Sequence, residues 1–207
     1  MKKILLSVAF LLAVQIAFAQ EVKFGIKAGV NFANQDFKLE TGGVSISPST
    51  KSIVSFHIAG LVDYGVSSNF SIQPGLSITG KGSKFEAEGA TQKSDLMYIE
   101  IPVNGVAKFA AGSLGKFFIG AGPYAAFGVA GKTKYEEGND TEEMDSFSDE
   151  GFKKSDFGLN LLGGLELSNG VTINANYGLG LSNIAQSSDD EGSIKNKVVS
   201  ISLGFLF

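Results

Sequence analysis

The chain contains no cysteine and no arginine, and its single histidine is His57. Without cysteine there are no disulfides, no thiol chemistry and no lipidated N-terminal cysteine. Without arginine there are no bidentate clamps for phosphate or carboxylate groups. The formal net charge of −4 also argues against nucleic-acid binding, which requires a basic surface.

Motifs for catalysis and metal binding are missing as well. One histidine cannot build a His-rich metal site, and no HExxH, CxxC or GxSxG pattern occurs. We therefore predict no catalytic, cofactor-binding or metal-binding residues, and we predict that the protein is not an enzyme. The GAGPY sequence at 120–124 has glycines like a phosphate loop, but no helix follows it. We expect those glycines to let side chains from opposite strands meet.

Long apolar runs are also scarce, since the chain has one and it stands at the start. Two lysines precede this run, and the small-x-small sequence at 17–19 follows it. This order of charged, apolar and small residues is that of a cleaved secretory signal. An uncleaved membrane helix is the alternative, but the run is short for a span and Gln15 interrupts it. We predict a signal peptide over residues 1–19 and one domain over residues 20–207.

What the chain has in abundance is a period-two alternation of apolar and polar residues. In the first instance, Phe24 and Val30 stand on one face of a strand, while Lys23 and Lys27 stand on the other. The pattern returns about eight times, in segments long enough to cross a bilayer at a tilt. We predict strands near residues 22–33, 53–64, 70–81, 97–109, 116–130, 156–167, 171–182 and 196–207.

The connections between these segments alternate in length. Short turns are expected near 65–69, 110–115 and 168–170, the last with an Asn-Gly pair that favours a hairpin. Long polar loops are expected near 34–52, 82–95, 131–155 and 183–195. Short turns on one side and long loops on the other are typical of outer-membrane barrels. We predict an all-β fold, an eight-stranded antiparallel up-and-down transmembrane β-barrel with both termini on the short-turn side.

In such a barrel the apolar faces meet lipid and the polar faces meet the interior, or lumen. We expect the lumen to contain Lys23, Lys27, Gln73, Glu100, Asn104, Lys108, Asp156, Asn160, Glu166, Asn174 and Asn176. Phe118 and Tyr124 also fall on the inner face, as exceptions to the pattern. Both signs of charge occur in similar numbers, and eight strands enclose just enough room for their own side chains. We therefore expect paired charges in a filled lumen, with a narrow ion or water path as the alternative.

Two further groups of residues have alternative interpretations. Ser55 lies on the same face as His57, and Glu100 or Asp63 could complete a hydrolase-like trio, although a hydrogen-bonded lumen histidine explains the pattern as well. The acidic run within 131–155 could gather divalent cations, but it lacks the ligand order of an EF-hand. We expect a solvated, mobile loop there.

Several motifs are specific enough to suggest a family: KFGIKAGVNFA at the start of the mature chain, YIEIPVNGVAKF at 98–109 and FFIGAGPYAAFGVAGK at 117–132. They resemble the PorT-like outer-membrane β-barrel family of Bacteroidota. The terminal Phe207 resembles the signal by which the barrel-assembly machinery recognises its clients. The resemblance implies the fold and an outer-membrane location, and the family takes its name from a member tied to protein secretion.

We accordingly expect an exported, monomeric outer-membrane barrel surrounded by outer-membrane lipid and inserted by the barrel-assembly machinery. Its leading function is non-enzymatic, with external loops that contact the environment or partner proteins. A component of a secretion or transport assembly is the second hypothesis, and a narrow channel or lipid-modifying enzyme is the third.

Overall fold

A computed structural model describes residues 21–41, 44–87, 89–138, 140–148, 151–186 and 192–207. The strands are β1 (Val22–Thr41), β2 (Val44–Ile46), β3 (Ile53–Ser67), β4 (Phe70–Ala87), β5 (Ala90–Ala110), β6 (Gly115–Glu137), β7 (Asp140–Asp145), β8 (Ser155–Leu167), β9 (Val171–Gly180) and β10 (Gly192–Leu206), with a 3-10 turn, η1 (Gly112–Leu114), before β6. Across these described residues, no helix is both long and apolar enough to cross a membrane. The predicted signal peptide at 1–19 lies outside the described residues and stays a prediction.

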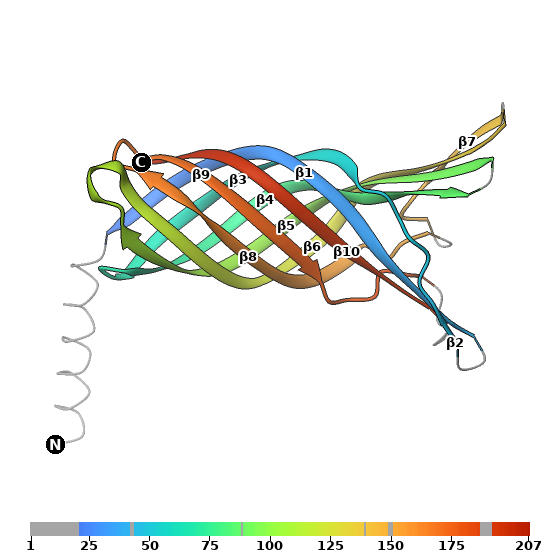
Figure 1. Ribbon diagram of the computed structural model, residues 1–207, viewed down its shortest axis with the longest axis horizontal. Helices are drawn as coiled ribbons and strands as arrows, with labels where there is room; N and C mark the ends of the chain where they lie inside the picture. The colour runs from blue at the N-terminus through green and yellow to red at the C-terminus, as the bar shows by residue number, and fades with distance from the viewer. Residues whose placement is uncertain (1–20, 42–43, 88, 139, 149–150, 187–191) are drawn as a thin grey trace, which may run out of the picture.

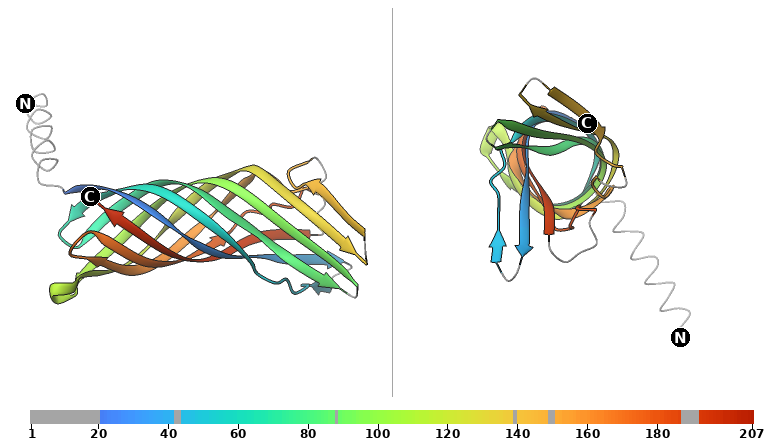
Figure 2. Two further views of the ribbon diagram at one scale, coloured as in Figure 1. Left: turned by 90° about the horizontal axis from the view of Figure 1, so that it is seen from above. Right: turned by 90° about the vertical axis from the view of Figure 1, so that its right-hand side faces the viewer.

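Eight of the ten strands form a closed ring, which Figure 2 shows end-on. Neighbours pair antiparallel in the order β10-β9-β8-β6-β5-β4-β3-β1, and β1 pairs back with β10. The other two strands, β2 and β7, are hairpin arms that pair with the far ends of β1 and β6. The predicted eight-stranded up-and-down barrel is confirmed.

The outer wall of the ring is apolar. Phe24, Ile58 and Leu161 come from three different strands, and each is 55% exposed. Water-soluble monomers rarely expose contiguous apolar patches larger than a few hundred Å². A continuous belt of such side chains around a closed barrel is instead the surface that lipid covers.

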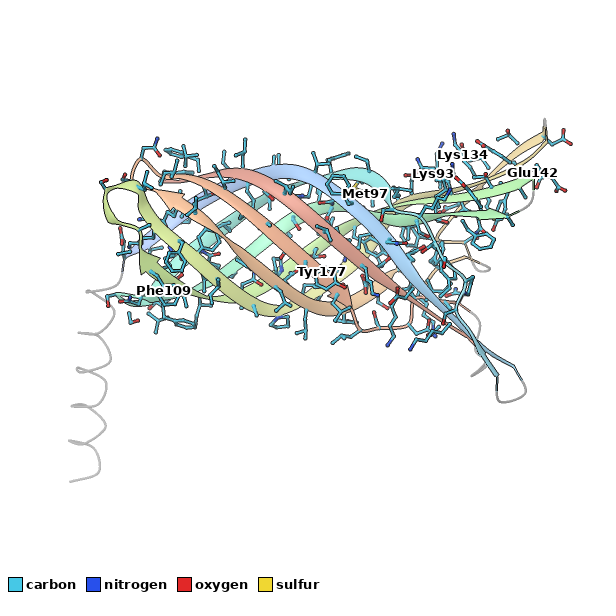
Figure 3. All side chains as sticks on the ribbon, viewed as in Figure 1. Lys93, Met97, Phe109, Lys134, Glu142 and Tyr177 are labelled. Atoms are coloured by element: carbon cyan, nitrogen blue, oxygen red, sulfur yellow. The ribbon has the colours of Figure 1, made fainter. Side chains whose placement is uncertain are left out.

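Stacked aromatic rings mark the short-turn end of this wall. The ring centroids of Phe109 and Phe117 lie 4.9 Å apart, and those of Phe24 and Phe207 lie 6.4 Å apart. Figure 3 labels Phe109 at the end of the barrel where β1 begins and the chain ends. Aromatic girdles form at the two interfaces of a membrane-spanning barrel, so these rings mark one edge of the apolar band.

The other end of the barrel differs from the prediction. The long loop predicted at 82–95 is wrong, because β4 continues to Ala87 and β5 begins at Ala90. β1 and β6 also extend beyond their predicted ends, to Thr41 and Glu137. Outside the membrane both faces of a strand meet water, so the alternation that identifies the wall segments disappears. The extended strands project beyond the ring at the right of Figure 1.

Candidate functional site: the filled lumen and the projecting hairpins

Two lysines and two carboxylates fill the lumen near the short turns. The ammonium of Lys108 lies 2.8 Å from Glu166 and also pairs with Asp63. Lys23 lies 3.2 Å from the other oxygen of Glu166, and Gln73 donates a 3.2 Å hydrogen bond to Asp63. The four charges balance, which removes the large penalty of an unpaired buried ion. This short-turn cluster joins β1, β3, β4, β5 and β8 across the lumen.

A second cluster lies toward the hairpin end. Lys81 Nζ is 2.8 Å from Glu100 Oε2 and 3.0 Å from Asp156 Oδ2. Asp156 is fully buried and accepts further hydrogen bonds from Asn196 and Tyr124, at 3.0 and 3.3 Å. The Lys81 ammonium also lies 4.1 Å from the centroid of the Tyr124 ring. This hairpin-end cluster has one lysine and two carboxylates, and with the first cluster it confirms the predicted pairing of lumen charges.

Lys27 is the exception to that pairing. It forms no ion pair with another described residue, and it lines a cavity of about 50 Å³ between the two clusters. Asn104 lines the same cavity, and its buried side-chain oxygen has no hydrogen-bond partner among the described residues. Glu100, the extra carboxylate of the hairpin-end cluster, also borders the cavity and balances the charge of Lys27. A polar chamber of this size suits ordered water rather than a substrate.

His57 belongs to a hydrogen-bond network on the β1, β3 and β10 side of the lumen. Its Nδ1 lies 2.7 Å from Asn31 Oδ1, and its Nε2 lies 2.8 Å from Ser202 Oγ. The Asn31 amide nitrogen donates to Thr79, which turns the Asn31 oxygen toward the histidine ring. His57 therefore donates from Nδ1 and accepts the Ser202 hydroxyl proton at Nε2. The prediction of a hydrogen-bonded lumen histidine is confirmed.

The structure does not bring the hydrolase-like trio together. Among the described residues no hydrogen bond joins Ser55 to His57; the Ser55 hydroxyl lies instead against Gly80, where a Cβ atom would come within 1.7 Å of Ser55 Oγ. The two carboxylates considered for the trio belong to the ion-pair clusters. Ser202, His57 and Asn31 are connected in the order of a catalytic triad, but Ser202 is 2% exposed. The small chamber beside it leaves no room for an ester substrate.

An apolar cap closes the lumen at the hairpin end. Tyr98 and Ile184 are fully buried, and Phe152 joins them in one hydrophobic cluster. Phe147 packs edge-on against Tyr98, with ring centroids 5.6 Å apart. The cap residues after β7 and β9 lie in segments that the sequence predicts as polar loops. The isolated apolar residues within those polar runs are the feature of the sequence that could have predicted the cap.

Phe118 and Tyr124 in β6 are exceptions to the polar inner face of the barrel. Both side chains face the lumen as predicted and are buried. The GAGPY glycines have a further reason, because a Cβ on Gly122 would lie 2.0 Å from the backbone oxygen of Val103. Val103 belongs to the neighbouring strand β5. Glycine is therefore needed at this position for the close approach of adjacent strands.

A β-bulge separates the wall part of β6 from its projecting part. Tyr98 of β5 pairs with Gly128, while the next residue down the strand, Met97, pairs with Ala130. Val129 is thus an extra residue, and both Val129 and Ala130 are exposed. A bulge of this kind shifts the alternation of side chains by one residue.

The bulge decides which side chains of the projecting sheet share a face. Beyond it, Tyr135 turns to the face that continues the lumen side, where Gln92 donates a 3.0 Å hydrogen bond to the Tyr135 hydroxyl. Lys132 and Lys134 turn to the opposite face, which continues the lipid-facing side. We call these the inner and outer faces of the hairpins.

Ion pairs cover the outer face. Lys84 lies 2.8 Å from Glu86, which also pairs with Lys51. Hydrogen bonds from Lys51 and Lys84 lower the pKa of Glu86 to about 2. Farther along the sheet, Lys132 lies 2.5 Å from Glu143, and this hydrogen bond lowers the pKa of the Glu143 carboxyl.

The acidic run is therefore more ordered than the sequence suggests. The prediction of a mobile loop over 131–155 is wrong for its first half, because residues 131–137 and 140–145 form the paired strands β6 and β7. Within the described part of the chain, no group of three acidic or histidine side chains is placed to hold a metal ion. Asp149, Glu150 and the acidic residues at 189–191 lie outside the described residues.

The family described as outer membrane protein beta-barrel domain matches residues 18–186. No curated protein matches the chain. Among solved structures, Ail, the attachment invasion locus protein of Yersinia pestis, is 16% identical, with 89% of this chain and 99% of that chain covered and a TM-score of 0.39.

Two other solved structures match the chain over similar lengths. The outer membrane protein OprG from Pseudomonas aeruginosa is 13% identical over 91% of this chain and 97% of its own, with a TM-score of 0.47. The outer membrane protease OmpT from Escherichia coli is 9% identical over 90% of this chain and 96% of its own, with a TM-score of 0.39. At this level of similarity none of them assigns an activity to this chain, because one fold hosts many functions.

Proposed function

The chain belongs to the family of outer membrane β-barrel domains, and from this premise we propose that it is a non-enzymatic barrel whose hairpins bind partners at the cell surface. The filled lumen carries the proposal. Two ion-pair clusters, the His57 network and the apolar cap occupy the interior, and the chamber between the clusters measures about 50 Å³. The projecting sheet, by contrast, stands clear of the barrel.

The orientation follows from the general arrangement of such barrels. Short turns face the periplasm and long connections face outward, so the hairpins would lie outside the cell and both termini inside. Export by the signal peptide at 1–19 and insertion by the barrel-assembly machinery fit this orientation. The belt of apolar side chains supports a monomer surrounded by outer-membrane lipid.

A finer placement in the PorT-like family rests on the motifs that carry the resemblance. Two of them lie side by side in the wall, where Pro102 of YIEIPV pairs with Tyr124 of GAGPY. Membership would make a component of a secretion assembly the second candidate function. Purification of the protein from its native membrane distinguishes the two candidate functions. Co-purification of other proteins in a stoichiometric complex would favour a component of a secretion assembly.

The orientation can be tested with single cysteines, because the chain has none of its own. We expect a membrane-impermeant maleimide to label Glu142→Cys in intact cells. Ser113→Cys, in the short turn η1, should be labelled only after the outer membrane is permeabilised. The reverse pattern would overturn a surface role for the hairpins.

The lumen can be tested by conductance. We expect no stable ion current from the purified protein in a planar bilayer, because paired charges and the apolar cap block the path. A steady current through the wild-type barrel would favour the narrow-channel alternative.

A further inference from the structure

A groove lies on the inner face of the projecting hairpins. It has a volume of about 440 Å³, and its lining includes Phe85, Ala90, Tyr135, Glu137, Asp140 and Glu142. We call it the hairpin groove. Its volume falls in the range of roughly 300–1,000 Å³ that is usual for ligand sites.

Strand register places these residues on one face. Phe85 lies opposite Gln92, which lies opposite Tyr135, and Tyr135 lies opposite Glu142. One pair farther out, Glu137 stands between Ala90 and Asp140. The apolar side chains of Phe85 and Ala90 therefore lie on the β4 and β5 side of the groove, and the three carboxylates lie on β6 and β7.

The two hairpin faces differ in the balance of their charges. On the outer face Glu86, Asp95 and Glu143 each pair with lysine. The register also places Glu136 and Asp145 on that face, and they form no ion pair with another described residue. On the groove face the three carboxylates form no ion pair with another described residue. The chain thus supplies lysines to one face and leaves the other face negative, which favours a cationic occupant.

The layout of the groove narrows the chemistry of that occupant. The described acids do not converge into a set of three that could hold a metal ion. They are instead spread along a groove that also presents the rings of Phe85 and Tyr135. Aromatic faces attract ammonium and guanidinium groups and also pack against apolar side chains. A ligand that carries several cations beside apolar groups meets all of these features.

We propose that the hairpin groove binds basic, amphipathic peptide segments. Lysine or arginine side chains of the peptide meet Glu137, Asp140 and Glu142, and its apolar side chains pack on Phe85 and Tyr135. This inference rests on the proposed surface function and names the partner class for it.

The test uses the purified full-length protein in uncharged detergent, with a labelled synthetic peptide of alternating lysine and leucine. We expect the triple variant Glu137→Gln, Asp140→Asn, Glu142→Gln to weaken binding roughly tenfold, since three exposed ion pairs are removed. The matched control is Glu86→Gln, Asp95→Asn, Glu143→Gln, which removes the same charge from the outer face. It should change the affinity less than twofold, and retention of the folded barrel is checked for every variant by its resistance to SDS.

Three results would overturn the proposal. Equal loss in the two triple variants would show unspecific charge attraction. Equal binding of oligolysine, together with no effect of Tyr135→Ala, would show that the apolar part of the groove is unused. Displacement of the peptide by millimolar Ca²⁺ at constant ionic strength would point to a metal site.

This test and the labelling test fail independently. Binding to the purified protein does not depend on how the barrel is oriented in a cell. If the peptide does not bind while Glu142→Cys is labelled from outside, the surface function stands and the ligand class is wrong.

Discussion

The wall of the barrel and the hairpins that continue it are built from the same strands, yet their polarity is reversed. In the wall part of β4, Ile78 faces outward and Thr79 faces the lumen. A few residues farther along the strand, Lys84 faces outward, while Phe85 faces the inner side and lines the groove. The solvent explains the difference, because lipid requires apolar groups on the outer face and water does not.

The same contrast holds for ion pairs. In the lumen, lysine and carboxylate groups are buried, and each cluster joins several strands. On the hairpins the pairs are exposed to water and join neighbouring residues or strands. The strength of an ion pair should therefore depend on its location far more than on its geometry.

The largest expected effect comes from breaking a buried pair. Asp156→Ala removes a partner of Lys81, Asn196 and Tyr124 in the fully buried hairpin-end cluster. We expect it to lower the free energy of unfolding by roughly 3–5 kcal/mol. Asp95→Ala, which removes an exposed partner of Lys93, should cost less than about 1 kcal/mol. Urea unfolding in lipid vesicles measures both, and equal costs would contradict the comparison.

The next largest effect on the free energy of unfolding is expected from lysine at an exposed apolar position that faces lipid, compared with one that faces water. Leu161 on the wall is 55% exposed and Met144 on β7 is 48% exposed. Leu161→Lys should cost roughly 2–4 kcal/mol, because the ammonium would face the hydrocarbon. Met144→Lys should be nearly neutral, because its side chain already meets water. Unfolding in the same vesicles gives both values, and similar costs would place the wall in water.

The bulge in β6 offers a way to reverse the faces of the hairpins. Deletion of Val129 should restore strict alternation and turn Lys132 and Lys134 toward the groove and Tyr135 away from it. We expect roughly tenfold weaker binding of the lysine-leucine peptide, or about 1.4 kcal/mol. Unchanged affinity in a barrel that still resists SDS would show that the bulge does not define the groove.

The smallest effect concerns pH. The pKa of Glu86 is lowered to about 2, so its pairing with Lys51 and Lys84 is present above its ordinary pKa and is lost as pH falls toward 2. Protection of the Lys84 amide, which donates a 2.9 Å hydrogen bond to the Lys51 carbonyl, should be equal at pH 7 and pH 5. Amide exchange corrected for its intrinsic rate measures this, and a loss of protection at pH 5 would contradict the assignment.

The sequence predicted the wall well because the membrane imposes a simple rule on it. Every wall strand needs one apolar face, so residues such as Phe24 and Lys23 reveal the strand and its orientation. The lumen position of Lys108 followed from the same rule, although its particular partners did not. Lys81 was not among the residues expected in the lumen, although its partners Glu100 and Asp156 were.

The hairpins and the cap could not be predicted in the same way. Strands in water keep polar residues on both faces, so the segment at 82–95 is typical of a loop. The bulge at Val129 can be recognised only when the pairing of β6 with β5 is known, because one strand alone does not show which residue is extra. The burial of Ile184 depends on tertiary contacts with Tyr98, which is distant in sequence.

The closure of the ring has a consequence for the order of assembly. Every other wall strand pairs with a neighbour that is close in sequence, but β1 pairs with β10, and Gly25 lies opposite Leu206. The seam therefore cannot form until β10 has been made and has met β1, which is the slow, long-range step of such a topology. Asn31 and His57 bond across this seam to Ser200 and Ser202. The histidine network thus stabilises the closed barrel by hydrogen bonds across the seam between its first and last strands.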